Sequence, residues 1–343
     1  MPVQEFFPYL YRLYKHLSCL HILLRFLRQG EIIACREDTV IGLVGVVHFP
    51  LRVLDKTHKA GYMLDLRVDA AYRSGTTAYK LLNTAVDHIR RSDTDLVIAN
   101  FLKDNKRPLV FTSGRGGMPK GQYLGTNRIF NIIPLFKMRP DRRFKIDKPA
   151  ETDIPEIIEL YRKYASGFSI APVMTEDRFR NYLGSIDGLS LDNFLVAREN
   201  GRIRAVTALW DEHAYKSYQV LKLNFSIRVA TGVLNFLSLF MRVPHPIRLN
   251  EPLRQLSLVL YAHDDCQEAL DTLFRHANNI SLGSEYTIIM LYAQENDPVF
   301  RFMKKYIGIS VRSEMYLFSK EPEVIEKMKE NSPAVLFDLS MTI

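Results

Sequence analysis

The sequence predicts an α/β protein of two similar domains, each with a mixed, mostly antiparallel central sheet flanked by helices. Alternating apolar segments typical of strands recur between segments with helical periodicity. The order hairpin, strand, helix, strand occurs once before residue 144 and again after it, which indicates an internal duplication. With 343 residues, 47% of them hydrophobic, the chain is long enough for two cores.

The first half begins with an apolar segment, residues 6–30, in which arginine and lysine recur. That interruption predicts an amphipathic helix and argues against a signal peptide, which needs a charge-free core. Alternating apolar residues predict strands at 31–37, 39–49, 62–68 and 95–102, and one or two strands within 122–136. Apolar residues at helical spacing predict a helix at 78–89.

A polar, proline-containing run at residues 138–153 separates the two halves. We therefore place the predicted domains at 1–143 and 144–332, followed by a strand-like tail at 333–343. The tail is apolar in strict alternation from Val335 to Met341, without a partner strand in its own domain. We expect it to cross back and pair with an exposed sheet edge, for which the first domain is the candidate.

The second half repeats the element order of the first. A helix is expected to begin at Asp153-Ile154-Pro155, and Asn200-Gly201 is a strong hairpin-turn signal. The apolar segment 230–241 is interpreted as a buried helix or the lining of a pocket. The other expected elements are strands at 255–263, 286–297 and 311–320 and helices at 266–280 and 298–306.

Charge is distributed unevenly along the chain. Residues 1–144 contain 23 Lys+Arg and 12 Asp+Glu, a net charge of +11, whereas the remainder contains 23 and 26, a net charge of −3. The basic half predicts an anionic partner. A phosphorylated cofactor and nucleic acid both fit, but no Lys/Arg cluster with interleaved aromatic residues supports nucleic acid.

The cysteine residues and the hydropathy of the sequence indicate where in the cell the protein is expected. Cys19, Cys35 and Cys266 form no CxxC pair, so we expect a reducing, cytoplasmic location and neither a disulfide framework nor a metal site. No stretch reaches about 18 uninterrupted apolar residues, so no membrane span is predicted.

The segment "VDAAYRSGTTAYKLL" (68–82) joins a predicted strand to a predicted helix through small residues and an arginine. A helix N-terminus has free N–H groups and a partial positive charge, so such a loop can hold phosphate. A simple strand-to-helix turn would use the same residues, and the loop alone leaves both interpretations open.

The same segment resembles the acetyl-CoA signature of the GNAT superfamily of acyltransferases, with Ala70 in place of the usual proline and Thr76 in place of the first glycine. Val68, Tyr72, Arg73 and Ala78 match. The resemblance implies acetyl-CoA or another acyl-CoA as cofactor. The cofactor-binding residues that it implies are Leu66, Val68, Arg73, Ser74, Gly75, Thr76, Thr77, Ala78 and Asn105.

The resemblance also implies direct transfer of the acyl group to an amine, with a base for the ammonium and an acid for the thiolate. Asp65 is the candidate base, although an outward-facing aspartate of a strand is the more ordinary role for such a residue. Thr112 stands where the family has the tyrosine that serves as the acid, so either another group such as Tyr123 or solvent would protonate the thiolate. A binding protein that has lost the chemistry is the alternative.

The corresponding loop of the second half, "AHDDCQEAL" (262–270), has no glycine and no arginine. Asp264 and Asp265 would repel a pyrophosphate, so we expect the first half alone to bind the cofactor. The acceptor stays open among small amines, aminoacyl groups, peptides and polyamines, and the sequence does not address the oligomeric state.

Overall fold

The computed structural model describes residues 30–36, 40–73, 75–103, 105, 110–115, 118–214, 218–220, 247–330 and 334–337, and seven single positions between 221 and 246. The predicted helix at 6–30 lies outside them, except for its last residue. The chain divides into two compact units that are discontinuous in sequence. The C-terminal unit comprises Arg128–Gly167 and Met174–Val311. The N-terminal unit comprises the described residues up to Asn127, Phe168–Val173 and those from Arg312 onward.

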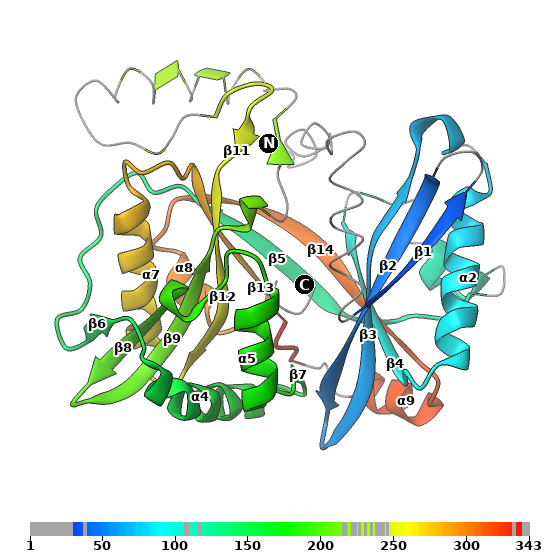
Figure 1. The fold of residues 1–343 in the computed structure, drawn as a ribbon, viewed down its shortest axis with the longest axis horizontal. Coiled ribbons are helices and arrows are strands. Elements are labelled where there is room, and N and C mark those ends of the chain that lie inside the picture. Colours follow the sequence, from blue (N-terminus) through cyan, green and yellow to red (C-terminus); the bar gives the residue numbers. More distant parts are fainter. Residues whose placement is uncertain are drawn as a thin grey trace. The chain divides into compact units, whose positions relative to one another are not determined.

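The N-terminal unit is a sheet with helix α2 (Thr77–Arg91) packed on it (Figure 1). Helix α2 buries Leu81, Leu82, Ala85, Val86 and Ile89, which confirms the predicted apolar face. The sheet order is β1-β2-β3-β4-β14-β5. The strands are β1 (Gly30–Arg36), β2 (Val40–Val53), β3 (Lys56–Val68), β4 (Leu96–Leu102), β5 (Gln122–Ile132) and β14 (Gly308–Ser319).

Strand β14 comes from the far end of the chain and completes the N-terminal sheet. Its residues Ser313–Ser319 pair antiparallel with Leu102–Leu96 of β4. The sequence predicts this strand correctly but assigns it to the second domain. Strands β5 and β14 are each divided between the two units, β5 after Asn127 and β14 after Val311. The division of the chain into domains at 1–143 and 144–332 stays a prediction.

Within the described residues of the C-terminal tail, 334–337, pairing is limited to one isolated bridge. Strand β7 (Ile170–Pro172) pairs antiparallel with Leu51–Val53 of β2, and Val335 forms a parallel bridge with Ile170. The Leu336 amide donates to the Ile170 carbonyl at 2.8 Å. The tail therefore joins the N-terminal unit through a short bridge, while residues 338–343 lie outside the described part of the chain.

The C-terminal unit has the sheet order β14-β5-β13-β12-β9-β8-β6, with helices α4, α5 and α7 beside it (Figure 1). Its strands are β6 (Lys145–Asp147), β8 (Phe194–Glu199), β9 (Arg202–Trp210), β12 (Gln255–His263) and β13 (Ile288–Gln294). A two-stranded pair, β10 (Tyr218–Gln219) and β11 (Pro252–Leu253), is separate. The helices are α4 (Ile154–Ser166), α5 (Glu176–Ser185), α7 (Gln267–Ser281) and α8 (Phe300–Met303).

Local signals in this unit match the structure. Asn200 and Gly201 have φ values of 51° and 81° between β8 and β9, which confirms the hairpin turn. Helix α4 begins at Ile154 with Pro155 in its first turn, as predicted. Every residue of β12 is buried, and α4 and α7 both pack against β9 and β12. Helix α9 (Pro322–Glu330) belongs to the N-terminal unit.

Substitution of Phe337 tests how much the C-terminal tail contributes to stability. Its ring is fully buried, 5.3 Å from that of Tyr62. We expect Phe337→Ala to lower the free energy of unfolding by about 3–5 kcal/mol, because it leaves a cavity in the core. Urea denaturation followed by circular dichroism measures this. Phe136→Ala is the control, because Phe136 is 61% exposed, and its effect should stay within about 0.5 kcal/mol. Equal urea midpoints would contradict the role of the tail.

Candidate functional site

The loop Asp69–Thr76 connects the carboxyl end of β3 to α2. Asp69 Oδ1 accepts a hydrogen bond from the Ala71 amide at 2.9 Å and caps the short 3-10 helix Ala70–Tyr72. Arg73 is exposed, and its Nε donates to the Val68 carbonyl at 3.0 Å. This hydrogen bond holds the Nε end of the guanidinium group beside the last residue of β3. The loop therefore presents a cation beside the start of α2.

The first turn of α2 can receive an anion. Its residues, Thr77–Lys80, include no acid, and the N-cap residue Thr76 makes no side-chain capping bond. The leading N–H groups of a helix have no intrahelical acceptor, and the helix dipole favours negative charge there. The exposed Gly75 adds no side chain that would block the approach. Ser74 lies outside the described residues.

Strands β3 and β4 part beside this loop. Their parallel register covers only Ala60–Met63 and Leu96–Ala99. Beyond Met63, β3 has a bulge at which Asp65 has a φ of 52° and the register with β2 shifts between Leu43 and Gly45. A bulge leaves one residue out of the ladder and re-aims its main chain. The implied cofactor residues Leu66 and Val68 follow this bulge, and Leu66, Val68, Leu81 and Val44 share one apolar cluster.

The two candidate catalytic side chains are not brought together. Asp65 Oδ1 accepts from Arg67 Nη2 at 2.8 Å, so the carboxylate is ion-paired. Tyr123 lies on β5, separated from β3 by β4 and β14, a span of about 14 Å. Its hydroxyl bonds Thr126 Oγ1 at 2.8 Å. Asn105 is exposed, three residues beyond the end of β4.

Two polar groups near the parting strands were not identified from the sequence. Tyr316 of β14 lies opposite Ala99 and donates to Glu314 Oε2 at 3.2 Å. Burial and the Glu314 charge both raise the pKa of Tyr316. No sequence signal placed this tyrosine beside β4, because its strand lies more than 200 residues away along the chain.

The second group joins three strands of the N-terminal sheet. Asn127 Nδ2 donates to Asn100 Oδ1 at 2.8 Å, and Asn100 Nδ2 donates to Tyr62 Oη at 3.2 Å. Asn127 is fully buried. Side chains alternate between sheet faces along a strand, so Asn100 faces away from Ala99 and Phe101. A polar group therefore lies on the sheet face opposite to α2.

An apolar cavity of about 230 Å³ lies between α2 and the sheet in this unit. Met63 and Ala99, the last paired residues before the strands part, both line it. One end of the cavity therefore lies where the strands part. The other apolar lining residues are Leu82, Val86, Ile89, Val97, Phe101, Phe111, Met118, Pro119 and Phe318.

The C-terminal unit has the same short parallel ladder and bulge, but it lacks a loop like Asp69–Thr76. Gln255–Leu258 pair in parallel with Ile288–Leu291, and Leu260 has a φ of 52° at a bulge against β9. Only Asp264–Cys266 separate β12 from α7, however, where the other unit has Asp69–Thr76. The shorter connection leaves no room for a phosphate-binding loop of the same kind.

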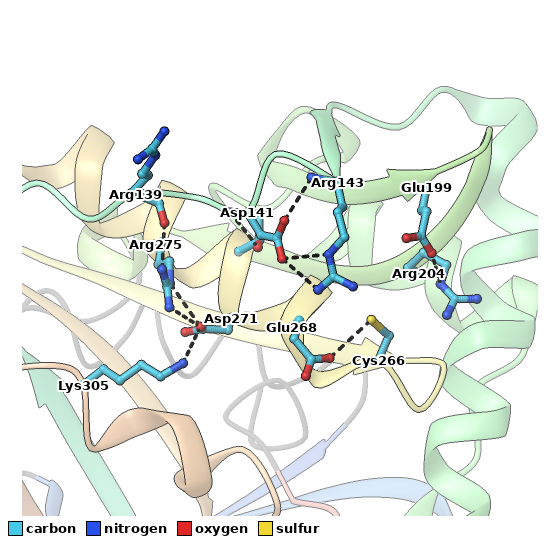
Figure 2. Close-up of polar contacts among 11 residues, drawn as sticks. Arg139, Asp141, Arg143, Glu199, Arg204, Cys266, Glu268, Asp271, Arg275 and Lys305 are labelled. Carbon is cyan, nitrogen blue, oxygen red and sulfur yellow. Dashed lines mark hydrogen bonds and ion pairs between the residues drawn. The ribbon is translucent and has the colours of Figure 1, made fainter.

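Charged side chains already pair around this shorter connection. Asp264 pairs with Arg204 at 2.8 Å, and Asp265 pairs with Lys163 at 2.7 Å. The Lys163 hydrogen bond lowers the pKa of Asp265, whereas burial raises that of Asp264. Figure 2 shows Glu268, in the first turn of α7, accepting a hydrogen bond from the Cys266 thiol at 3.6 Å. An anion would meet carboxylates here.

A buried polar cluster lies near the carboxyl ends of β12 and β13. Asp297 accepts from Tyr261 Oη at 2.8 Å, from Tyr164 Oη at 3.3 Å and from the Val299 amide at 2.8 Å. Burial raises the pKa of Asp297 to about 6 and that of Tyr164 well above its usual value. Both ring nitrogens of the buried His263 have no hydrogen-bond partner among the described residues. Its pKa is lowered by burial.

Comparison with known proteins supports the fold. No protein-family model and no curated protein sequence matches the chain. Saccharomyces cerevisiae N-myristoyltransferase with bound myristoyl-CoA matches with a TM-score of 0.55 and 14% identity, over 82% of this chain and 67% of that one. A second structure of that enzyme gives a TM-score of 0.56 and 14% identity, over 83% and 65% of the two chains.

A conserved protein of Enterococcus faecalis V583, described as a probable N-acyltransferase, also matches. Its TM-score is 0.55 at 8% identity, over 91% of this chain and 67% of that one. The chain thus spans about two thirds of the length of these neighbours. At such low identity the likeness concerns the fold, which is mixed α/β and GNAT-like, as the sequence predicted.

Asp297 makes the stability of the C-terminal unit depend on pH. Its pKa is about 6 in the fold against an ordinary 3.8, so the folded state binds the proton more tightly. The resulting stabilisation is complete below pH 3.8 and is lost as the pH rises through 6. Asp297→Asn should remove this loss, which amounts to about 2 kcal/mol in unfolding free energy between pH 4 and 7.

Urea titrations at a series of pH values measure this dependence. Asp265→Asn is the matched control, because its exposed carboxylate has a lowered pKa. That variant should keep the loss of stability that Asp297 causes. An unchanged pH dependence in Asp297→Asn would show that Asp297 does not titrate in this range.

Proposed function

We propose that the protein is an acyl-CoA-dependent N-acyltransferase with its cofactor site in the N-terminal unit. The observation that carries the proposal is the combination of parted strands, a strand bulge and an acid-free helix start toward the carboxyl end of β3. In this proposal, phosphate groups of CoA bind the first turn of α2 and Arg73, and the pantetheine arm follows Leu66–Val68. The comparisons support acyl-CoA as the cofactor class.

The reaction in this proposal is a direct transfer. The amine nitrogen of the acceptor attacks the thioester carbon, a proton leaves the nitrogen, and CoA departs as a thiol. Asp65 and Tyr123 are the proposed base and acid. The acceptor is a small-molecule or peptide amine.

The apolar cavity favours an acyl group longer than acetyl. Because Met63 and Ala99 line it at the point where β3 and β4 part, a chain on the thioester could enter it there. Arg90, Asp95, Ser319 and Lys320 also line the cavity. Burial of each methylene group contributes about 0.8 kcal/mol. Acetyl would leave most of this volume unused.

A non-catalytic CoA-binding protein is the second candidate. The ion pair between Asp65 and Arg67 and the distance of Tyr123 from β3 favour it, since neither side chain is poised for proton transfer. Release of CoA thiol in the presence of an amine separates the two functions: an enzyme releases it faster than the uncatalysed reaction, and a binding protein does not.

Arg73→Glu tests the position of the cofactor site. The change replaces a cation beside the α2 N-terminus by an anion, so we expect the dissociation constant of an acyl-CoA to rise at least ten-fold, or about 1.4 kcal/mol. Isothermal titration calorimetry measures it. Asp264→Ala, at the corresponding connection of the C-terminal unit, should leave the constant within about two-fold. Equal affinities of both variants would place the cofactor elsewhere.

Ala99→Phe tests the cavity. A phenyl ring on this buried position of β4 would fill the space where the acyl chain is proposed to enter. We expect binding of acetyl-CoA to change little and binding of thioesters with about eight or more carbons to weaken at least ten-fold, because their methylene groups lose burial. Leu102→Phe, at an exposed position near the end of the same strand, is the control. A variant with the wild-type chain-length profile would exclude this cavity as the acyl site.

A further inference from the structure

The two units differ most in one strand connection. In the N-terminal unit, a two-residue turn, Leu54-Asp55, joins β2 to β3. In the C-terminal unit, the corresponding strands β9 and β12 are joined by residues 211–254. The short pair β10 and β11 closes the base of this insertion, where the Asn250 amide donates to the Val220 carbonyl at 2.8 Å. The fold can be built without the insertion, as the other unit shows.

The insertion carries exposed apolar side chains on helical backbone. The exposed fractions are 80% for Phe225, 50% for Val229, 52% for Val233 and 62% for Phe236. Each of the four has helical backbone, and their spacing of four, four and three residues is that of one face of a helix. The sequence interpretation of 230–241 was a buried helix or the lining of a pocket; the exposure of Val233 and Phe236 contradicts burial at these two residues, and the pocket lining stays a prediction.

The charge of the insertion is one-sided. Residues 213–250 contain no Asp or Glu, but they contain the five cations Lys216, Lys222, Arg228, Arg242 and Arg248. This contrasts with the net charge of −3 for the chain beyond residue 144. Arg228 is exposed, has helical backbone and directly precedes Val229 in the chain.

The segment is too short to cross a bilayer. The longest charge-free run within it, residues 229–241, has 13 residues, whereas a spanning helix needs about 20. Among the helices of the described residues, none combines the length and hydropathy of a membrane span. An apolar helical face with flanking cations and no acids is typical of helices that lie in the plane of a membrane surface.

We propose that the face formed by Phe225, Val229, Val233 and Phe236 docks onto an anionic lipid surface, with Arg228 contacting the headgroups. The apolar side chains enter the boundary between headgroups and acyl chains, and each nearby cation adds to the attraction. Pairing of two copies through this face is disfavoured, because it would bring together two basic segments that contain no acid. This proposal does not rest on the proposed acyl-CoA site.

Flotation of the full-length protein with lipid vesicles tests the proposal. Vesicles of phosphatidylcholine containing about one third phosphatidylglycerol should carry most of the protein, and pure phosphatidylcholine vesicles much less. The double variant Phe225→Ser/Phe236→Ser should reduce the floated fraction at least ten-fold, and Arg228→Glu should reduce it on the anionic vesicles. Phe136→Ser, at a comparably exposed phenylalanine outside the insertion, should float like the wild type.

Unchanged thermal melting of each variant shows that lost flotation does not reflect unfolding. Equal flotation of the double variant and the wild type would overturn the proposal, as would absence of wild-type flotation on the anionic vesicles. A lipid-independent dimer in sedimentation velocity that the double variant abolishes would overturn it in favour of a second copy.

Discussion

The antiparallel ladder between β4 and β14 is the constraint on which the N-terminal unit depends. Seven residues of β14, Ser313–Ser319, lie opposite Leu102–Leu96, and β5 follows on the other side of β14. Phe318 of β14 lines the apolar cavity. The sheet that carries the candidate cofactor site is therefore incomplete until residues from the end of the chain have joined it. Such non-local pairing adds loop-closure entropy and slows folding.

The tail adds a second contact of the same kind. Val335, Leu336 and Phe337 are buried in the N-terminal unit, although they follow the last helix of the chain. Strand β7, to which they bind, also belongs to this unit while its neighbours in sequence belong to the other. A unit assembled from three separated stretches couples the candidate site to distant parts of the sequence.

The two bulges show how one backbone geometry can carry different chemistry. Asp65 and Leu260 share a φ of 52°, and each follows a four-residue parallel ladder by two positions. In the N-terminal unit, a long loop with Arg73 and an apolar cavity follow. In the C-terminal unit, a three-residue connection with paired carboxylates lies near the buried Asp297 cluster. From this asymmetry we infer that only the N-terminal unit binds the cofactor.

Local physical preferences explain what was predictable from the sequence. The apolar face of α2, the Asn200-Gly201 turn and the Pro155 helix start depend on neighbours within a few residues. The loop at Arg73 was found because its small residues and cation lie between a strand and a helix in sequence. The alternation in the tail also indicated a strand that lacked a local partner.

The sequence by itself determined most of the long strands and helices, their order and the asymmetry between the two strand-to-helix connections, but it missed α5, α9 and the short strands β7, β10 and β11. Only the tertiary structure decided that β14 lies beside β4, that Tyr316 faces Ala99 and that Asp65 pairs with Arg67 while Tyr123 lies three strands away. It also decided that Phe225 and Phe236 are exposed. The reason is physical: hydrophobic periodicity specifies which face of an element is apolar, but not which distant element will cover that face, or whether any will.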